Sequence, residues 1–394
     1  MSETRATQGA RAAPGPYEQM GVSKVINAAA TLTRLGGNII PPSVVEAIVG
    51  ASRGFVDLNE LQLRVGERLA ELTHNEGAYV TCGAAAGLYL GVAATLALKD
   101  PERFRRVPTD PPLEYEVLIH RAHRNPYDVA VAQFGVRLVE VGQVGPRATE
   151  EPVEFLERMH DRTLAILYVI SGWLPQGAPP LERLTAAARC AGVVVIVDAA
   201  AQLPPVENLW KYTREMGADL AVFSGGKDLA GPADTGLVVG RADLIEAMRR
   251  IGYPKHGIGR MLKVSKEAMV GLMVAVERYL RLDHEARRRR AEEVVEYFVR
   301  ELGAIPGVTV ERSFPNEAGQ PLPRARVRLQ SALAWLTPAG LVEALARGRP
   351  SVEVLPAEDG VFLNPMTLQD GEELIVAARI REVLAEAQRT RSVP

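Results

Sequence analysis

Lys227 is the residue of this chain whose type and position most clearly suggest covalent chemistry. It lies between two apolar runs, Leu220–Phe223 and Leu237–Val239, which indicate short buried strands, and the loop around it is made of small residues. Lysine forms Schiff bases with carbonyl compounds once its pKa is lowered, and glycines allow a bulky group to approach the backbone. The chain has 7 lysines against 39 arginines, so Lys227 does not come from a lysine-rich background. The alternative is a surface lysine on a glycine turn.

A second strand-like run ends in a segment of small residues, Cys82, Gly83, Ala84 and Ala85. Free backbone N–H groups at the start of the following helix would hold a phosphate, and small side chains would admit it. The same residues could instead only allow close helix packing.

Two further runs end in His123 and Asp198. An imidazole at His123 could lie over an aromatic cofactor ring or make an ordinary hydrogen bond. A carboxylate after the apolar run Val193–Val197 pays a desolvation cost unless a cation meets it, and a protonated pyridine nitrogen would serve. The alternative for Asp198 is capping of the next helix.

These groups belong together if the strands form one open α/β sheet, because ligands lie beyond the carboxyl ends of such strands. A phosphate site, an imidazole, a pyridinium partner and a Schiff-base lysine describe a site for pyridoxal 5′-phosphate (PLP). Gln202 is a candidate contact of the cofactor's phenolic oxygen, and Ser224 precedes Lys227 on the same strand end. No metal is expected, and the two cysteines, Cys82 and Cys190, cannot make a disulfide framework or a cysteine-rich zinc site.

The order of apolar and helical segments predicts two domains. Strand-like runs alternate with helical stretches up to about residue 260, which predicts an α/β domain with a mostly parallel sheet covered on both faces. A long helix over 264–302, two period-two strands and two further helices predict a small α+β domain. The expected division is a disordered segment 1–16, an N-terminal arm and helix 17–60, a large PLP-binding domain 61–260, and an interdomain helix with the small domain 261–394.

Composition limits the possible partners. The 394 residues are 47% hydrophobic and 24% charged, with a formal net charge of −2, which gives no electrostatic case for nucleic acid or an anionic membrane. The basic run Arg287–Arg290 is predicted to be a solvated helix face, because glutamates flank it. Two cysteines and no apolar run of about 18–20 residues predict a cytoplasmic protein that does not cross a membrane.

Several stretches between about residues 20 and 280 carry a family resemblance: Val25–Asn27, Thr33–Gly37, Thr81–Gly87, His123–Asp128, Val197–Pro205, Phe223–Lys227, Gly231–Pro232 and His256–Arg260. Through them the chain resembles the fold-type-I PLP-dependent enzymes of the bacterial selenocysteine synthase (L-seryl-tRNA(Sec) selenium transferase) group. Within that group it is similar to the D-glucosaminate-6-phosphate ammonia-lyase-like branch. Two positions depart from the pattern: Cys82 stands where a serine is expected, and Arg347–Pro350 replaces a Gly-Asp-Pro type of sequence.

The resemblance implies an aspartate-aminotransferase-like fold with a mostly parallel seven-stranded sheet. It also implies that Lys227 is the Schiff-base lysine, that Asp198 is the pyridine partner, and that the protein is a homodimer or larger homo-oligomer with sites at subunit interfaces. Lys227 would then act as general acid and base at the α-carbon of an amino acid or amino sugar acid. On resemblance, α,β-elimination with release of ammonia is the favoured reaction. The alternatives are a racemase, an aminotransferase, a selenium transferase or a non-catalytic PLP-binding protein.

Substrate carboxylate or phosphate groups would be held by basic residues. The candidates are Arg34, His256, Arg260 and Arg328, the last of which shares a strand face with Arg324 and Arg326. Surface salt bridges are the alternative for each arginine.

Overall fold

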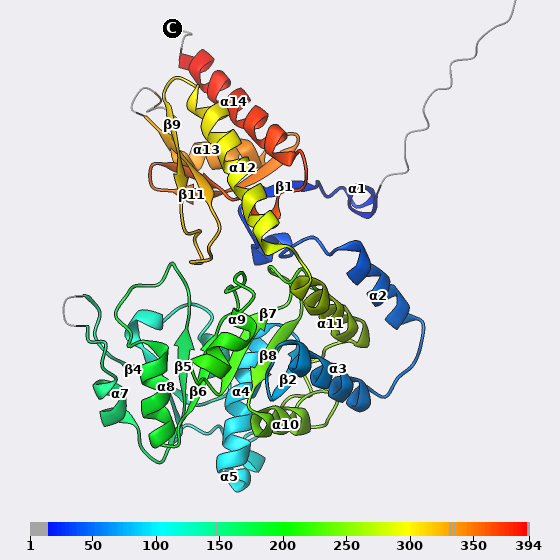
Figure 1. The fold of residues 1–394 in the computed structure, drawn as a ribbon, viewed down its shortest axis with the longest axis vertical. Helices are drawn as coiled ribbons and strands as arrows, with labels where there is room; N and C mark the ends of the chain where they lie inside the picture. Colours follow the sequence, from blue (N-terminus) through cyan, green and yellow to red (C-terminus); the bar gives the residue numbers. More distant parts are fainter. Residues whose placement is uncertain (1–14, 146–147, 331–332, 334–335, 392–394) are drawn as a thin grey trace, which may run out of the picture. The chain divides into compact units, whose positions relative to one another are not determined.

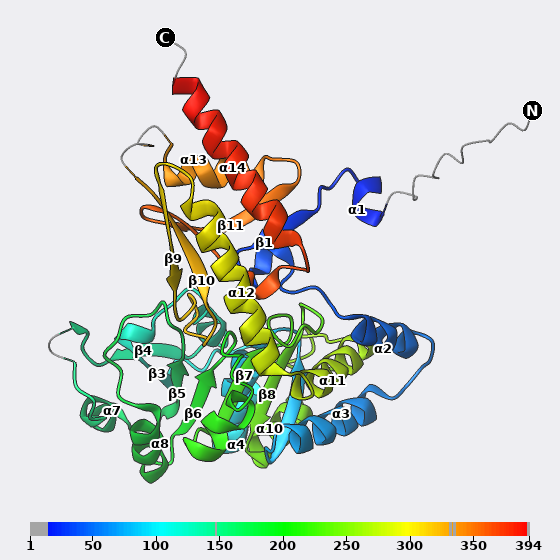
Figure 2. The same cartoon turned by 45° about the horizontal axis from the view of Figure 1, so that its top comes forward.

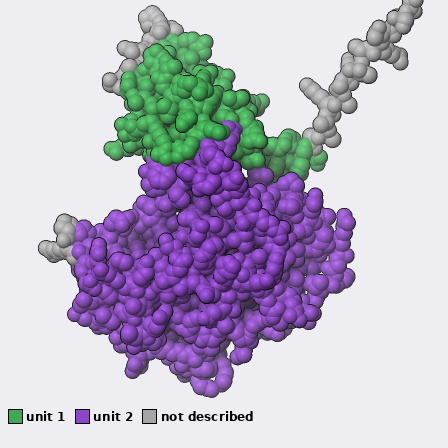
Figure 3. Space-filling model, in the orientation of Figure 1, with its two compact units in different colours: residues 1–30, 291–313, 324–394 green, residues 31–290, 314–323 purple. Residues whose placement is uncertain are grey.

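The computed structural model of the protein describes residues 15–145, 148–330, 333 and 336–391. These residues form two compact units, coloured separately in Figure 3. Among the described residues, unit 1 contains those up to 30, those from 291 to 313 and those from 324 onward, whereas unit 2 contains those from 31 to 290 and from 314 to 323. The first 14 residues of the segment 1–16, which was expected to be disordered, lie outside the described residues.

Unit 2 is built on a seven-stranded sheet with the strand order β2-β8-β7-β6-β5-β3-β4 (Figures 1 and 2). The strands are β2 (Gly77–Thr81), β3 (Glu116–His120), β4 (Arg137–Val141), β5 (Thr163–Val169), β6 (Val194–Asp198), β7 (Leu220–Ser224) and β8 (Gly236–Gly240). The β3–β4, β3–β5, β5–β6 and β6–β7 pairs are parallel, and β8 runs antiparallel to both β2 and β7. The predicted mostly parallel seven-stranded sheet is therefore confirmed.

Helices cover both faces of this sheet, which explains its nearly continuous apolar strands. Along β6, Val195 and Val197 pack in one core cluster while Val194 and Ile196 pack in the other. The first cluster includes residues of α3 (Leu58–Leu72), α8 (Leu181–Cys190) and α11 (Lys266–Leu280), and the second includes residues of α4 (Ala84–Lys99), α6 (Val129–Ala132) and α10 (Ala242–Ile251). Shorter or peripheral helices complete the unit: α2 (Pro42–Ser52), α5 (Pro101–Arg106), α7 (Val153–Arg158) and α9 (Asn208–Trp210).

Helix α4 lies close to the sheet because its inner residues are small. A Cβ atom on Gly87 would lie 2.8 Å from both Val222 Cγ1 and Val238 Cγ2, so a larger residue there would have to displace the strands. The close approach places the start of α4 beside the carboxyl end of β7 and the start of β8, which the Lys227 loop joins.

Unit 1 has a five-stranded sheet with the order β1-β11-β12-β10-β9. Its elements are β1 (Val25–Ala28), α12 (His284–Gly303), β9 (Val308–Ser313), β10 (Arg324–Leu329), α13 (Pro338–Ala346), β11 (Ser351–Ala357), β12 (Gly360–Leu363) and α14 (Glu372–Arg391), preceded by α1 (Pro16–Gln19). Helix α12 begins in unit 2 and ends in unit 1. Strand β1 pairs in parallel with β11, and the sequence patterns did not predict β1, β11 or β12.

The long helix expected over 264–302 is two helices. Helix α11 ends at Leu280 and α12 begins at His284, and the Asp283 carboxylate accepts a hydrogen bond from the Ala286 N–H at 2.8 Å. A capping aspartate of this kind favours a new helix start over continuation. None of the helices in the described part of the chain is long and apolar enough to span a membrane.

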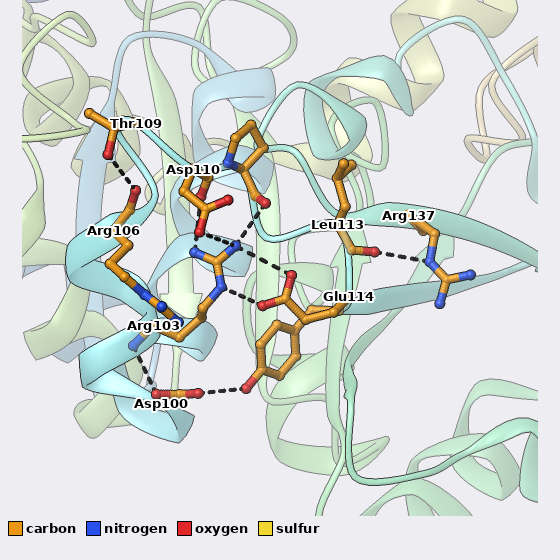
Figure 4. A network of polar contacts seen from close by, with 10 residues as sticks. Asp100, Arg103, Arg106, Thr109, Asp110, Leu113, Glu114 and Arg137 are labelled. Carbon is orange, nitrogen blue, oxygen red and sulfur yellow. Dashed lines mark hydrogen bonds and ion pairs between the residues drawn. The ribbon is translucent and has the colours of Figure 1, made fainter.

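A charged cluster around the buried Arg103 fixes the segment between α5 and β3 (Figure 4). The Arg103 guanidinium forms an ion pair with Glu114 and donates hydrogen bonds to the backbone oxygens of Asp110 (2.9 Å) and Pro111 (2.7 Å). Because β3 begins directly after this segment, the cluster lies at the amino end of the strand, away from the carboxyl ends where ligands bind in such sheets. It has a structural role.

Candidate functional site

Lys227 lies on the loop that joins β7 to β8. The Gly225 N–H donates to the Thr235 backbone oxygen at 2.8 Å, and the Gly231 N–H donates to the Gly225 oxygen at 2.9 Å. A Cβ on Gly226 would lie 2.4 Å from Ala233 Cα, so glycine is required there for close packing. Lys227 itself is half-buried. The loop is therefore a fixed platform rather than an exposed turn.

Asp198, at the carboxyl end of β6, shares a buried environment with Lys227. Only 8% of Asp198 is exposed, and its Oδ1 accepts a hydrogen bond from the Ala200 N–H at 3.0 Å. Burial raises the pKa of Asp198, and the Ala200 N–H and the charge of Lys227 offset this only in part. Burial likewise lowers the pKa of Lys227, against the opposing effect of Asp198. The mutual attraction of the two groups does not compensate for their desolvation.

The raised pKa of Asp198 and the lowered pKa of Lys227 are what a PLP site would require of these two residues. An added positive charge beside Asp198 would restore its ionised form, and the pyridine nitrogen of PLP is such a charge when protonated. A lowered pKa leaves more of the Lys227 amine unprotonated, which is the form that reacts with a carbonyl group. The buried carboxylate and the half-buried amine therefore fit the cofactor.

The predicted phosphate-binding segment lies at the start of α4. Gly83 is the N-cap residue with φ +90° and ψ 160°, and the helix start has no side-chain cap. Uncapped N–H groups at a helix start favour an anion. The Cys82 thiol is half-buried, and burial raises its pKa, as does the negative charge of Asp234. The thiol is therefore neutral, and it adds no charge to this segment.

His123 is buried and hydrogen-bonded at the end of β3. Its Nδ1 accepts a hydrogen bond from the Val169 N–H at 3.3 Å, and its ring meets the Tyr168 ring edge-on at 4.5 Å. Burial lowers the pKa of His123 to about 4, with a smaller effect from His120. The ordinary hydrogen bond considered from the sequence is thus present, and stacking on a cofactor ring stays a prediction.

Gln202 and Ser224 are also close to this edge of the sheet. Both hydrogen bonds of the Gln202 amide nitrogen go to backbone oxygens, those of Ile170 (3.0 Å) and Ala318 (2.9 Å). A contact with the phenolic oxygen of a cofactor would therefore have to use the amide oxygen or replace one of these bonds. The Ser224 N–H donates to the Ala200 oxygen at 3.3 Å, which joins the end of β7 to the segment after Asp198.

The four candidate substrate-binding residues are distributed over both units. Arg34 is exposed in a short helical turn, Thr33–Leu35, and the same segment reaches the Lys227 loop, because the Asn38 N–H donates to the Gly226 oxygen at 2.9 Å. His256 is exposed, and the exposed Arg260 guanidinium lies 5.2 Å from the centre of the Tyr253 ring.

Arg328 belongs to unit 1 and forms ion pairs there with Glu311 (2.7 Å) and Asp359 (3.3 Å). Its neighbour Arg326 pairs with Asp359 at 2.9 Å, and Arg324 lies 3.7 Å from the centre of the Phe362 ring. The salt bridges named as the alternative are therefore present for Arg326 and Arg328, and substrate binding by Arg328 would have to compete with them.

Sequence reasoning missed the partners of Asp228, the residue next to Lys227. Its carboxylate is fully buried and pairs with Arg287 at 2.7 Å. The prediction of a solvated face for Arg287–Arg290 is wrong for Arg287, because this side chain turns toward a buried carboxylate, while Arg288 pairs with Glu285 at the surface. The only signal in the sequence was an aspartate directly after the candidate lysine.

Comparison with known proteins agrees with this geometry. Residues 120–322, which include Asp198 and Lys227, match the family described as aminotransferase class-V. A 5′-C-glycyluridine monooxygenase-decarboxylase from Streptomyces sp. is 33% identical over 94% of this chain and 92% of that protein. The D-glucosaminate-6-phosphate ammonia lyase of Salmonella typhimurium is 31% identical over 95% of this chain and 99% of that protein.

More distant relatives and solved structures support the same assignment. The L-seryl-tRNA(Sec) selenium transferase of Moorella thermoacetica is 27% identical over 96% of this chain and 86% of that protein. A solved structure of D-glucosaminate-6-phosphate ammonia-lyase superposes with a TM-score of 0.80 at 30% identity, covering 95% of this chain and 99% of that one. The resemblance seen in the sequence motifs is confirmed.

The burial of His123 predicts a pH-dependent loss of stability. Its pKa of about 4 lies below the ordinary value of 6.5, so the unfolded chain binds a proton that the folded chain does not, and stability falls as the pH drops from 6.5 toward 4. The loss attributable to His123 is about 3 kcal/mol. In His123→Asn, whose side-chain oxygen can accept the Val169 N–H, urea unfolding from pH 7 to 4 should show a correspondingly smaller loss. The exposed His256→Asn is the matched control and should behave as wild type; equal pH profiles for all three proteins would contradict the prediction.

Proposed function

The chain belongs to the aminotransferase class-V family, and we propose that it is a PLP-dependent lyase whose cofactor is held by Lys227 and Asp198. The observation that carries the proposal is the pair of desolvated groups at the ends of β6 and β7, a buried carboxylate and a half-buried amine that do not compensate each other. Unit 2 is then the cofactor-binding domain, since it contains both residues.

Each residue of the site has a separate task in this proposal. When bound, PLP supplies an electron sink for negative charge at the α-carbon of an amino substrate. Asp198 would keep a proton on the pyridine nitrogen, and the uncapped start of α4 would hold the phosphate beside Cys82 and Gly83. Lys227 would bind the cofactor's carbonyl carbon and would move a proton at the substrate's α-carbon, a role that its lowered pKa favours.

The reaction that we propose is α,β-elimination on an amino acid or amino sugar acid. Loss of the α-proton and of a β-hydroxyl group as water leaves an enamine, and hydrolysis of its imine form gives a 2-oxo acid and ammonia. Support comes from the ammonia lyase that is 31% identical to this chain over nearly the full length of both. The 33% identity to a monooxygenase-decarboxylase makes oxygen-dependent decarboxylation of an amino acid the second candidate.

Arg34 is our first choice for binding the substrate's carboxylate or phosphate. Its segment touches the Lys227 loop through the bond from Asn38 to Gly226. Arg260 and His256 follow as exposed residues of the same unit. Arg328 ranks last, because its guanidinium is already paired with Glu311 and Asp359.

We also propose that the protein works in the cytoplasm. Both cysteines of the chain are free, Cys82 half-buried and Cys190 exposed. A reducing compartment is the usual location of free thiols of this kind.

A panel of substrates distinguishes the candidate reactions. PLP-loaded protein should release ammonia and a 2-oxo acid in equal amounts from hydroxy-amino acids or amino sugar acids, without using oxygen. Asp198→Asn should lower kcat by about 10²-fold or more, because the pyridine nitrogen loses its charged partner. Oxygen uptake with release of carbon dioxide would favour the second candidate, and exchange of the α-proton for deuterium alone would indicate a racemase.

We further propose that the protein is a homo-oligomer. Val44 of α2 is fully buried, yet Val45 and Val49, four residues apart on its other side, are exposed, as are Ile39 and Phe55 in the flanking segments. Exposed apolar residues that gather on one part of a protein surface mark association surfaces, and α2 with its flanking segments is our candidate for one. Light scattering should give at least twice the 42.7 kDa chain mass, and the double variant Val45→Glu, Val49→Glu should lower that mass. A wild-type mass equal to one chain would contradict the proposal.

A further inference from the structure

Asp228, directly after Lys227, is the centre of a buried polar cluster formed with two helices. Its side chain has no exposed surface. Arg287 of α12 donates to both carboxylate oxygens, at 2.7 Å to Oδ1 and 3.1 Å to Oδ2, and the Tyr279 hydroxyl of α11 donates to Oδ2 at 2.7 Å. A bidentate arginine with a third donor leaves this carboxylate well satisfied and fixed in direction.

The cluster acts on the backbone of Lys227 through a tight turn. The Ala230 N–H donates to the Lys227 carbonyl oxygen at 3.0 Å, so Asp228 occupies the second position of that turn. Ala230 has φ +55°, a left-handed conformation that a non-glycine residue adopts only when its surroundings hold it there. Anchoring Asp228 to two helices therefore holds the turn, and with it the α-carbon of Lys227.

The Asp228–Arg287 pair carries no net charge. Asp228 neutralises Arg287; burial opposes the charge of Arg287, but the hydrogen bonds and charge of Asp228 outweigh burial and raise its pKa. Burial and the charge of Arg287 lower the pKa of Arg278 of α11, and the charge of Asp228 opposes them. The His284 ring of α12 lies 4.7 Å from the Tyr279 ring. The charge that acts on the Lys227 amine is that of Asp198, which opposes the effect of burial on the pKa of the lysine. Removing either member of the Asp228–Arg287 pair would leave one uncompensated charge in a cluster that begins one residue after the lysine.

We propose that Asp228, Arg287 and Tyr279 are positioning residues that fix the backbone of Lys227, with the Asp228 carboxylate and the Arg287 guanidinium neutralising each other's charge. This inference deepens the proposed function and rests on it, because it assumes that Lys227 carries the cofactor. None of the three residues needs to touch the substrate. They act on the position of the Lys227 backbone and on the electrostatic potential at its nitrogen.

The pH titration of the cofactor's absorption band in PLP-loaded protein tests the inference. In Asp228→Asn the unpaired positive charge of Arg287 disfavours the protonated lysine–cofactor nitrogen, so the midpoint of the titration should fall by about half a pH unit or more. In Arg287→Met the unpaired carboxylate favours that protonated form, so the midpoint should rise by a similar amount. The exposed Arg288→Met on the same helix is the matched control and should keep the wild-type midpoint.

A neutral double variant separates positioning from charge and guards against loss of folding. Thermal unfolding is measured first, because each single substitution leaves a buried charge unpaired. Asp228→Asn combined with Arg287→Met should recover the wild-type midpoint, yet kcat should stay about tenfold lower with a similar KM, since the turn is no longer anchored. Opposite shifts in the two single variants support the inference. Where the single variants do not fold, a wild-type midpoint with a lowered kcat in the double variant supports it. Unchanged midpoints, or shifts of the same sign, would overturn it, whereas a wild-type protein with no cofactor band would overturn the proposed function itself.

Discussion

The burial of a carboxylate and an amine that do not fully compensate each other is the constraint on which the rest of the site depends. Asp198 is buried in the middle of the sheet edge, and its pKa is raised although Lys227 is near. The pKa of Lys227 is lowered for the same physical reason. A bound ligand that interacts with both groups stabilises such an arrangement, because its binding free energy offsets the desolvation of the carboxylate and the amine.

The surrounding structure holds these two groups in place with little freedom. Parallel strands β6 and β7 bring Asp198 and Ser224 to the same edge, and the hydrogen bond between Ser224 and Ala200 ties the ends of the two strands together. Gly226 permits the close contact with Ala233 that fixes the Lys227 loop. Gly87 lets α4 approach β7 and β8, the two strands that this loop joins. Close packing by small residues thus sets the position of the reactive groups, as the hydrogen bonds do.

The parts of the fold that depend on local patterns could be predicted from the sequence. Apolar runs ending in Asp198 and before Lys227 indicated parallel strands, and the rule that ligands lie at their carboxyl ends placed the two residues together. Strand β1 could not be found this way, because four residues near the N-terminus pair with β11 more than 300 positions later, and no local periodicity records such a partner. Arg287 was misjudged for a similar reason: its buried partner, Asp228, lies 59 residues earlier in the chain. The hydrogen bonds of Gln202 also depend on Ala318, which is distant in sequence.

Reduction with borohydride followed by peptide mapping is the measurement that bears most directly on the role of Lys227. Protein incubated with PLP should show an absorption band in the violet that disappears on reduction, and the label should be recovered on the peptide containing Lys227. Lys227→Arg should give neither the band nor the label. A label on another of the 7 lysines, or no violet band in the wild-type protein, would contradict the assignment of the buried Asp198 and Lys227 to a PLP site.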